Sequence, residues 1–139
     1  MLTRVLFSLA LICGLAGAAL AEESKVLALG LADHEVTEAE LASGAAPPVP
    51  KFNTPAVAYV LAAGLKKGDT VEITLINDDR ALLSNSETLA DDKATFLLQA
   101  GKRGVPAGGW PEGSYRAALK IMRDGKTLIE QTTDPIPFE

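Results

Sequence analysis

Apolar and polar residues alternate with a period of two along several short stretches of this chain. The clearest stretch is Thr70 to Asn77, in which Val71, Ile73 and Leu75 alternate with polar residues. This period predicts a β-strand with one buried face and one solvated face. Comparable runs between turn-forming residues predict further strands at Lys25 to Ala32, Ala56 to Ala63, Ala81 to Ser84, Lys93 to Gln99, Tyr115 to Arg123 and Lys126 to Thr133. Seven short strands at this spacing are typical of an all-β, antiparallel protein.

One of these strands departs from strict alternation. Leu97 lies on the expected polar side of its strand, between Thr95 and Gln99, while Phe96 and Leu98 lie on the other side. The pattern indicates either a strand that is covered on both faces or a local bulge.

The last two expected strands are joined by Asp124-Gly125, which predicts a hairpin with a type I′ turn. A two-residue loop fixes the register, because each residue before the turn then has one partner after it. The expected pairs are Met122 with Thr127, Ile121 with Leu128 and Leu119 with Glu130. An acid opposite an apolar row is unfavourable, so this register indicates either a sheet edge or a different turn.

The segment between the first two strands carries a helix start and a connector. Thr37-x-x-Glu40 matches a capping box, which predicts one or two helical turns from Glu38. Gly44 to Pro50 contains three prolines, which lack the amide donor that helices and sheets need. We therefore expect an extended connector there.

The N-terminus has the pattern of a secretory signal peptide. One cation, Arg4, precedes an uncharged apolar run from Val5 to Leu15, and small residues lead to Ala21 before the first acids. This pattern predicts cleavage after Ala21. The alternatives are an uncleaved anchor, for which 17 residues is short, and a lipid-modified Cys13, which lacks the small preceding residue of lipoprotein signals.

Cleavage would change the composition. The domain organisation becomes a signal peptide at 1–21, an N-terminal strand, helical turn and connector at 22–54, and a body at 55–139 that forms one domain with 22–54. The one cysteine would be lost with the signal, which leaves no disulfide and no thiolate. Of 13 basic side chains 12 would remain, against all 18 acids, for a net charge of −6. Nucleic acid and anionic lipid are disfavoured as partners by this charge, and stable membrane insertion is not expected after cleavage.

The segment Gly108-Gly-Trp-Pro-Glu-Gly-Ser-Tyr115, which leads into the last hairpin, resembles the late hairpin of bacterial extracytoplasmic immunoglobulin-like (fibronectin III-like) domains. The shared feature is a Pro-x-Gly-x-Tyr turn ahead of a strand, here Pro111, Gly113 and Tyr115. The resemblance covers Pro55 to Phe138 and implies an immunoglobulin-like β-sandwich, with Tyr115 buried and its hydroxyl bonded to nearby backbone. The inter-sheet disulfide and mid-strand tryptophan of antibody domains are missing, and no catalytic residue is implied.

The residue types of known catalytic and metal sites do not combine in this sequence. His34, the one histidine, lies among acids that include Asp33 and Glu40, but a transition-metal site needs more nitrogen or sulfur ligands than this. The chain has no Gly-x-Ser-x-Gly elbow and no phosphate-binding glycine loop before a helix. We therefore expect neither an enzyme nor a cofactor.

The stretch Ala100 to Trp110 predicts a long glycine-rich loop with Lys102 and Arg103 near one end and the one tryptophan at the other. Long loops on rigid sandwiches often bind partners, and Trp and Arg are frequent at interfaces. The candidate binding residues are Lys102, Arg103 and Trp110, unless Trp110 points inward as a core residue.

These inferences lead to one functional expectation and one alternative. We expect a secreted or periplasmic, non-catalytic binding module that recognises a protein or an envelope component through this loop or an exposed edge strand. The alternative is a carrier of a small molecule or metal, which would need polar groups converging in a pocket between the sheets.

Overall fold

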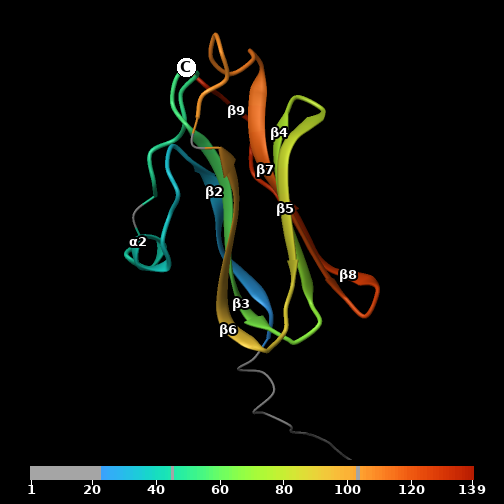
Figure 1. Ribbon diagram of the computed structural model, residues 1–139. Helices are drawn as coiled ribbons and strands as arrows, with labels where there is room; N and C mark the ends of the chain where they lie inside the picture. Colours follow the sequence, from blue (N-terminus) through green and yellow to red (C-terminus); the bar gives the residue numbers. More distant parts are fainter. Residues whose placement is uncertain (1–22, 45, 103) are drawn as a thin grey trace, which may run out of the picture.

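Two antiparallel sheets pack face to face in the computed structural model, which describes residues 23–44, 46–102 and 104–139 (Figure 1). The expected signal peptide, with Cys13, lies outside the described residues. One sheet has the order β2-β3-β6, and the other has the order β5-β4-β7-β8 with β9 also paired to β7. The elements are β2 (Lys25–Ala32), α2 (Glu38–Ala42), β3 (Ala56–Leu65), β4 (Thr70–Asn77), β5 (Arg80–Thr88), β6 (Lys93–Lys102), β7 (Ser114–Arg123), β8 (Lys126–Thr132) and β9 (Ile136–Pro137).

The expected all-β, antiparallel sandwich is confirmed. The described residues form seven long strands and, in addition, the two-residue strand β9. Strands β2 and β4 have the expected bounds. Strand β5 is longer than expected, because its second half, Ser84 to Thr88, is exposed and carries no apolar alternation. Backbone pairing with β4 defines that half of the strand.

The core lies between the sheets and is mostly aliphatic. Alternate residues of β4 are fully buried, namely Val71, Ile73 and Leu75, as the period of two predicts. They face the inward residues of the other sheet, which include Val60 and Leu98. Burial of these side chains is the main force that holds the two sheets together.

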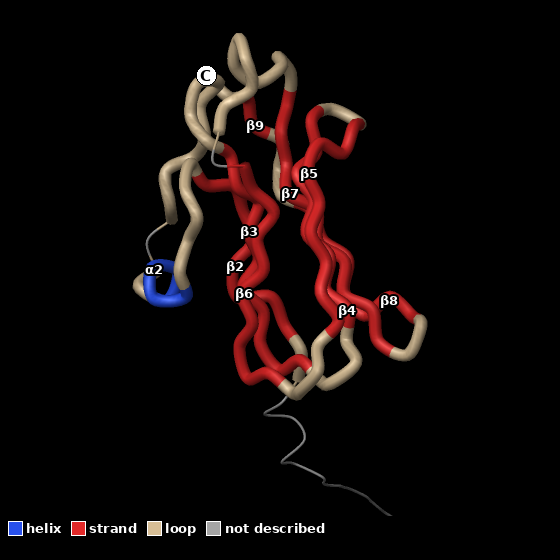
Figure 2. Tube along the Cα trace, viewed as in Figure 1, coloured by secondary structure: helices blue, strands red, loops and turns tan. Residues whose placement is uncertain are grey.

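The outer face of the β2-β3-β6 sheet is covered as well. The helix and connector, in residues 33–44 and 46–55, lie along this face in Figure 2. As a result β3 is buried on both sides, and a second small cluster forms around Ala32, Val36 and Tyr59 with Leu97 packed against it. Of the two explanations for Leu97, coverage on both faces is therefore correct, and the ladder between β3 and β6 has no bulge.

Gln99 fixes this cover to the sheet. Its side-chain oxygen accepts a hydrogen bond from the Val36 amide at 2.8 Å, and its side-chain nitrogen donates to the Val36 carbonyl at 2.9 Å. The amide side chain thus pairs with the Val36 backbone as a neighbouring strand would. Thr37 caps α2 as expected, since its hydroxyl accepts from the Glu40 amide at 3.1 Å.

The last hairpin has the expected turn but not all of the expected register. Asp124 and Gly125 both have positive φ, at 55° and 78°, as a type I′ turn requires. Met122 pairs with Thr127 as expected, but Ile121 pairs with Ile129, not with Leu128.

The reason is a one-residue bulge at Leu128, and it removes the unfavourable pair of the simple register. Lys120, not Leu119, now lies opposite Glu130, so that the acid has a basic neighbour across the strands. The expected pair of Leu119 with Glu130 was therefore wrong, because a two-residue turn fixes the register only as far as the first bulge.

Bulges of this kind occur on three of the four long strands that lie at the sheet edges. The register shifts once in β2, once in β5 and once in β8. In each case the extra residue on the edge strand is a leucine: Leu27, Leu82 and Leu128. The fourth edge strand, β6, has a regular ladder with β3.

Candidate functional site

Of the three candidate binding residues, the structure places only Trp110 in full. Lys102 is the last residue of β6, and its side chain lies outside the described part of the chain, as does Arg103. The Trp110 side chain points inward, with the residue 7% exposed. Its indole nitrogen donates to the Thr54 carbonyl at 2.7 Å, and its backbone amide donates to the Phe52 carbonyl at 2.8 Å. The ring is therefore a core residue.

Three aromatic rings close this end of the sandwich. Phe138, just after β9, stacks on Tyr115 with ring centroids 3.7 Å apart and an interplanar angle of 6°. It also meets Trp110 edge to face, with centroids 6.3 Å apart. Tyr115 is fully buried and its hydroxyl donates to the Pro111 carbonyl, which confirms the role expected of the Pro-x-Gly-x-Tyr turn. The loop and the C-terminal tail thus form one rigid cap.

Three apolar side chains are left exposed on the segments that meet at this end of the molecule, which is uppermost in Figure 1. Phe52 is 48% exposed, Val49 is 55% exposed and Val105 is 37% exposed. We call these three residues the apolar end. Val49 lies in the expected connector and Phe52 lies in the turn that follows it, where the sequence pattern predicted no exposed apolar site.

Phe52 is held in place by backbone contacts on both sides. Its carbonyl accepts from the Trp110 amide, and its amide donates to the Glu139 carbonyl at 3.2 Å. Its ring lies across Gly109, where a Cβ atom would be 2.7 Å from the ring. Gly109 has a φ of 90°, so a side chain there is disfavoured by the backbone as well. An exposed aromatic ring is therefore fixed in orientation by a buried scaffold.

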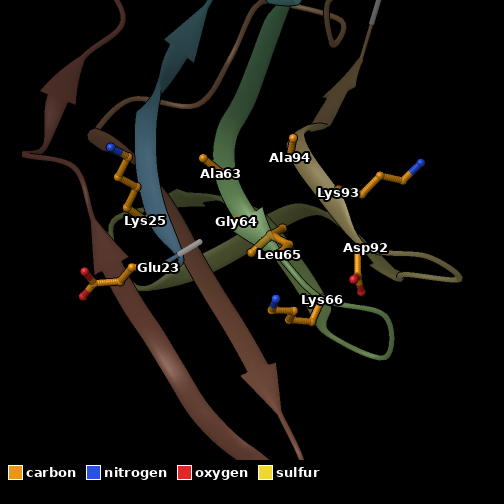
Figure 3. A pocket seen from close by; sticks show the side chains of 9 residues that line it. All are labelled: Glu23, Lys25, Ala63, Gly64, Leu65, Lys66, Asp92, Lys93 and Ala94. Carbon is orange, nitrogen blue, oxygen red and sulfur yellow. The ribbon is translucent and has the colours of Figure 1, made fainter. Parts of the chain in front are cut away.

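Two hollows that are lined by described residues open to the outside of the molecule. One, of about 270 Å³, adjoins the apolar end and is lined by Val49, Pro50, Lys51, Ile136, Pro137 and Glu139. Another, of about 380 Å³, lies at the opposite end, over β2, β3 and β6 (Figure 3). Its floor includes Ala63 and Ala94, and the amines of Lys25 and Lys93 point to opposite sides of it in Figure 3. These charges do not converge on a common point, as a catalytic or anion site would require.

His34 lies between two carboxylates. Its Nδ1 is 2.7 Å from Asp33 Oδ1, and its Nε2 is 2.7 Å from Glu40 Oε2. The pKa of His34 is raised above its ordinary value of 6.5, first by the hydrogen bond with Asp33 and then by that with Glu40. Within the described ranges, no set of three or more His, Cys, Asp or Glu side chains is placed to hold a metal ion.

A second ionic cluster closes the opposite end of the sandwich. Arg123 donates from Nε and Nη2 to the two carboxylate oxygens of Asp69, both at 2.8 Å, and Asp69 is 1% exposed. Arg123 also donates to the Ser24 hydroxyl, which in turn donates to the Gly64 carbonyl at 2.7 Å. The hydrogen bond from Arg123, more than any other contact, lowers the pKa of Asp69. The cluster joins β7 to the start of β2 and to the β3–β4 turn.

The edge strands offer poor templates for an added strand. A bulge interrupts the hydrogen-bonding edge, and β2, β5 and β8 each carry one. On β6 the Gln99 carbonyl already accepts from the Asn85 side chain at 2.8 Å. The described edges of both sheets are therefore interrupted or already engaged in a hydrogen bond.

Comparisons with known proteins do not assign the chain to a family. No protein-family model matches it, and no curated protein matches its sequence. Among the residues that the structure describes, no helix is both long enough and apolar enough to cross a bilayer.

Proposed function

We propose that this chain is an exported, non-catalytic immunoglobulin-like module that binds a protein or another component of the cell envelope through its apolar end. The observation that carries the proposal is the placement of Phe52, a residue that is 48% exposed while its backbone is bonded to Trp110 and Glu139. A large apolar side chain that is already ordered loses little conformational entropy on binding. Aromatic anchors of this kind carry much of the energy of known interfaces.

The grouping of strands supports the immunoglobulin-like part of the proposal. In chain order the first, second and fifth long strands form one sheet, and the third, fourth, sixth and seventh form the other. Constant-type immunoglobulin domains keep the fourth strand with the first sheet. Its transfer to the other sheet matches the fibronectin III-like variant that the sequence resembles. The buried Tyr115, bonded to Pro111, is the corner that such domains share.

Export and the absence of catalysis have separate support. The charge and apolar pattern of residues 1–21 favours removal of a signal peptide after Ala21. The ionic groups of the Asp33–His34–Glu40 and Asp69–Arg123 clusters face one another in pairs. Groups that are paired in this way stabilise the fold and are poorly placed to act on a substrate.

A carrier function receives less support from the arrangement of the interior. A carrier needs polar groups that converge in an enclosed pocket. The described positions between the sheets are mostly apolar, and the two hollows described above lie on the outside. We therefore place binding on the surface.

Site-specific photo-crosslinking in the envelope of the cells that make the protein tests this proposal. A photoreactive phenylalanine analogue at Phe52 or Val105 is expected to give a crosslinked product of one defined mass. The same analogue at Leu27 or Leu128, which are 47% and 40% exposed, serves as a matched control at apolar positions away from this end. Phe52→Ser in the Val105-labelled protein is expected to abolish the product. Equal yields at all four positions, or no product at either test position, would contradict the proposal.

The candidate cations of the loop are tested in the same assay. Arg103→Glu reverses one charge two positions before Val105 in the sequence. A loss of the crosslinked product in this variant would show that the Arg103 side chain belongs to the binding surface. An unchanged yield would restrict the surface to the apolar residues.

A further inference from the structure

The contacts of His34 define which protonation state the structure fits. Both ring nitrogens lie 2.7 Å from a carboxylate oxygen, Asp33 Oδ1 on one side and Glu40 Oε2 on the other. A neutral imidazole has one N–H group and can donate to only one of them, whereas an imidazolium donates to both. A neutral ring would turn a lone pair toward a carboxylate. The geometry therefore fits the doubly protonated ring.

The two carboxylates belong to different elements, so the imidazolium links them. Asp33 and His34 directly follow β2, and Glu40 lies in the middle of α2. In a capping box the glutamate side chain commonly returns to the N-cap amide, but the Glu40 side chain bonds to His34. A helix of five residues is too short to be stable without external contacts.

The start and the end of α2 are held differently. Ahead of the helix, Val36 is fixed by the neutral side chain of Gln99, and at its first residue Glu38 accepts from the Thr95 hydroxyl at 2.8 Å. Further along, Glu40 bonds to His34, and Leu41 packs on the outer face. Loss of the Glu40–His34 bond would therefore loosen the end of the helix and leave its start in place.

Acidic and phenolic groups surround the imidazole and its partners. Asp33 and Glu40 contact the ring directly, and Glu35 and Glu38 belong to the same segment. From β3, Tyr59 faces Glu40, and its pKa is raised first by burial and then by that negative charge. From β6 the facing groups are the neutral Thr95 and Gln99. The positive charge of the ring thus stabilises a region that is otherwise negative.

We propose that Asp33, His34 and Glu40 form a pH-sensitive clasp, which holds α2 against the outer face of the β2-β3-β6 sheet and releases its end when the ring loses a proton. The clasp acts on the cover of the sheet and is independent of the apolar end. Its contribution to stability is complete below the ordinary pKa of histidine, 6.5, and is lost as the pH rises through the higher pKa of the folded protein.

The chain's one histidine allows a direct test by NMR. The imidazole resonances give the pKa of His34, which is expected to lie above 6.5. Hydrogen exchange is measured over the same pH range at the Leu41 and Ser43 amides, which donate to Thr37 and Ala39 within the helix. After correction for the intrinsic rate, the exchange rate of these amides is expected to rise about two- to fivefold with pH. This is the change expected when one partly exposed ion pair is lost. The midpoint of this rise should coincide with the titration of the ring.

Two matched variants decide the mechanism. Glu40→Gln removes the charge that joins the helix to the ring and is expected to lower the pKa of His34 and abolish the pH-dependent step. Glu38→Gln changes a neighbouring acid that contacts Thr95 and is expected to keep the step. Core amides of β4 report that both variants are folded. Exchange that shows no step where the ring titrates, or a step that persists in Glu40→Gln, would overturn the proposal.

Discussion

Phe138 stacks face to face on Tyr115, with ring centroids 3.7 Å apart. The pair joins the C-terminal tail to the corner that leads into β7, and the edge of Trp110 completes the cluster. A tail with two prolines cannot add a full strand to the sheet. It contributes to the fold through this ring contact and through the two residue pairs of β9.

Removal of the stacked ring should therefore destabilise the whole sandwich. Phe138→Ala is expected to lower the free energy of unfolding by about 1–3 kcal/mol, less than for a fully buried ring because Phe138 is half-buried. Urea unfolding followed by Trp110 fluorescence measures this change. Phe52→Ala, which removes an exposed ring from the same end, should change the free energy of unfolding by less than about 0.5 kcal/mol. If Phe138→Ala and Phe52→Ala changed the free energy of unfolding equally, the stacking of Phe138 on Tyr115 would make no specific contribution to stability.

The two adjacent glycines of the loop separate the effect of backbone conformation from the effect of packing. Gly108 and Gly109 both have positive φ, at 81° and 90°, but only a Cβ atom at Gly109 would meet Phe52. Gly108→Ala is expected to cost about 1 kcal/mol through the backbone alone. Gly109→Ala should cost clearly more and should also displace Phe52, which differential scanning calorimetry and NMR shifts of the ring would report. A smaller cost at Gly109 than at Gly108 would mean that the ring does not rest on Gly109.

The Asp69–Arg123 pair should contribute to stability in a pH-dependent way. Asp69→Asn is expected to lower the free energy of unfolding near neutral pH by about 1.5–3 kcal/mol, since it weakens charge-assisted hydrogen bonds at a buried site. Folding lowers the pKa of Asp69 below its ordinary value of 3.8. The contribution of the pair to stability is therefore complete above pH 3.8, and it is lost as the pH falls through the pKa of Asp69 in the folded protein.

The difference between the natural protein and Asp69→Asn should therefore shrink in acid, as measured by urea unfolding from pH 7 to pH 2. Asp91→Asn, at an exposed turn, is the control and should leave stability unchanged at every pH. A difference between the natural protein and Asp69→Asn that stays constant across this range would exclude an ionic origin.

Gln99 is expected to be essential for the cover of the outer face. Gln99→Leu removes both hydrogen bonds to Val36 and should cost about 1–3 kcal/mol, because a buried backbone donor and acceptor lose their partner. Hydrogen exchange at the Val36 amide should accelerate far more than exchange within β4. Gln131→Leu, an equivalent change at an exposed position of β8, controls for the side chain itself. Unaltered protection at Val36 would mean that packing alone holds the cover.

The sequence predicted those parts of the fold in which burial alternates. Strand β4 has the expected bounds, because the inward residues Val71, Ile73 and Leu75 are apolar and alternate with residues on the sheet's more exposed side. The second half of β5 was missed, because both of its faces are exposed and its side chains carry no period. The register after Leu128 was also missed, since a bulge leaves no mark in an alternating sequence.

The candidate site was predicted only in part. A long loop was found from its glycines, but its expected start at Ala100 was wrong, because β6 extends to Lys102. The direction of Trp110 depends on Thr54 and Phe52, which are more than 50 positions away along the chain. The exposed residues of the apolar end were not distinguishable from core residues by type. Long-range packing decides which apolar side chains are left outside, and a local pattern does not contain that information.

The three leucine bulges on the edge strands have a consequence for the behaviour of the protein at high concentration. Flat, regular edges allow chains to join into fibres, and an extra residue twists the edge out of line with a neighbouring molecule. Deletion of Leu128 would leave the pairs Met122–Thr127 and Ile121–Ile129 in place and would straighten β8. Such a protein should fold normally and yet form thioflavin-positive fibrils sooner than its parent. One inserted residue in an edge strand would then be enough to slow aggregation.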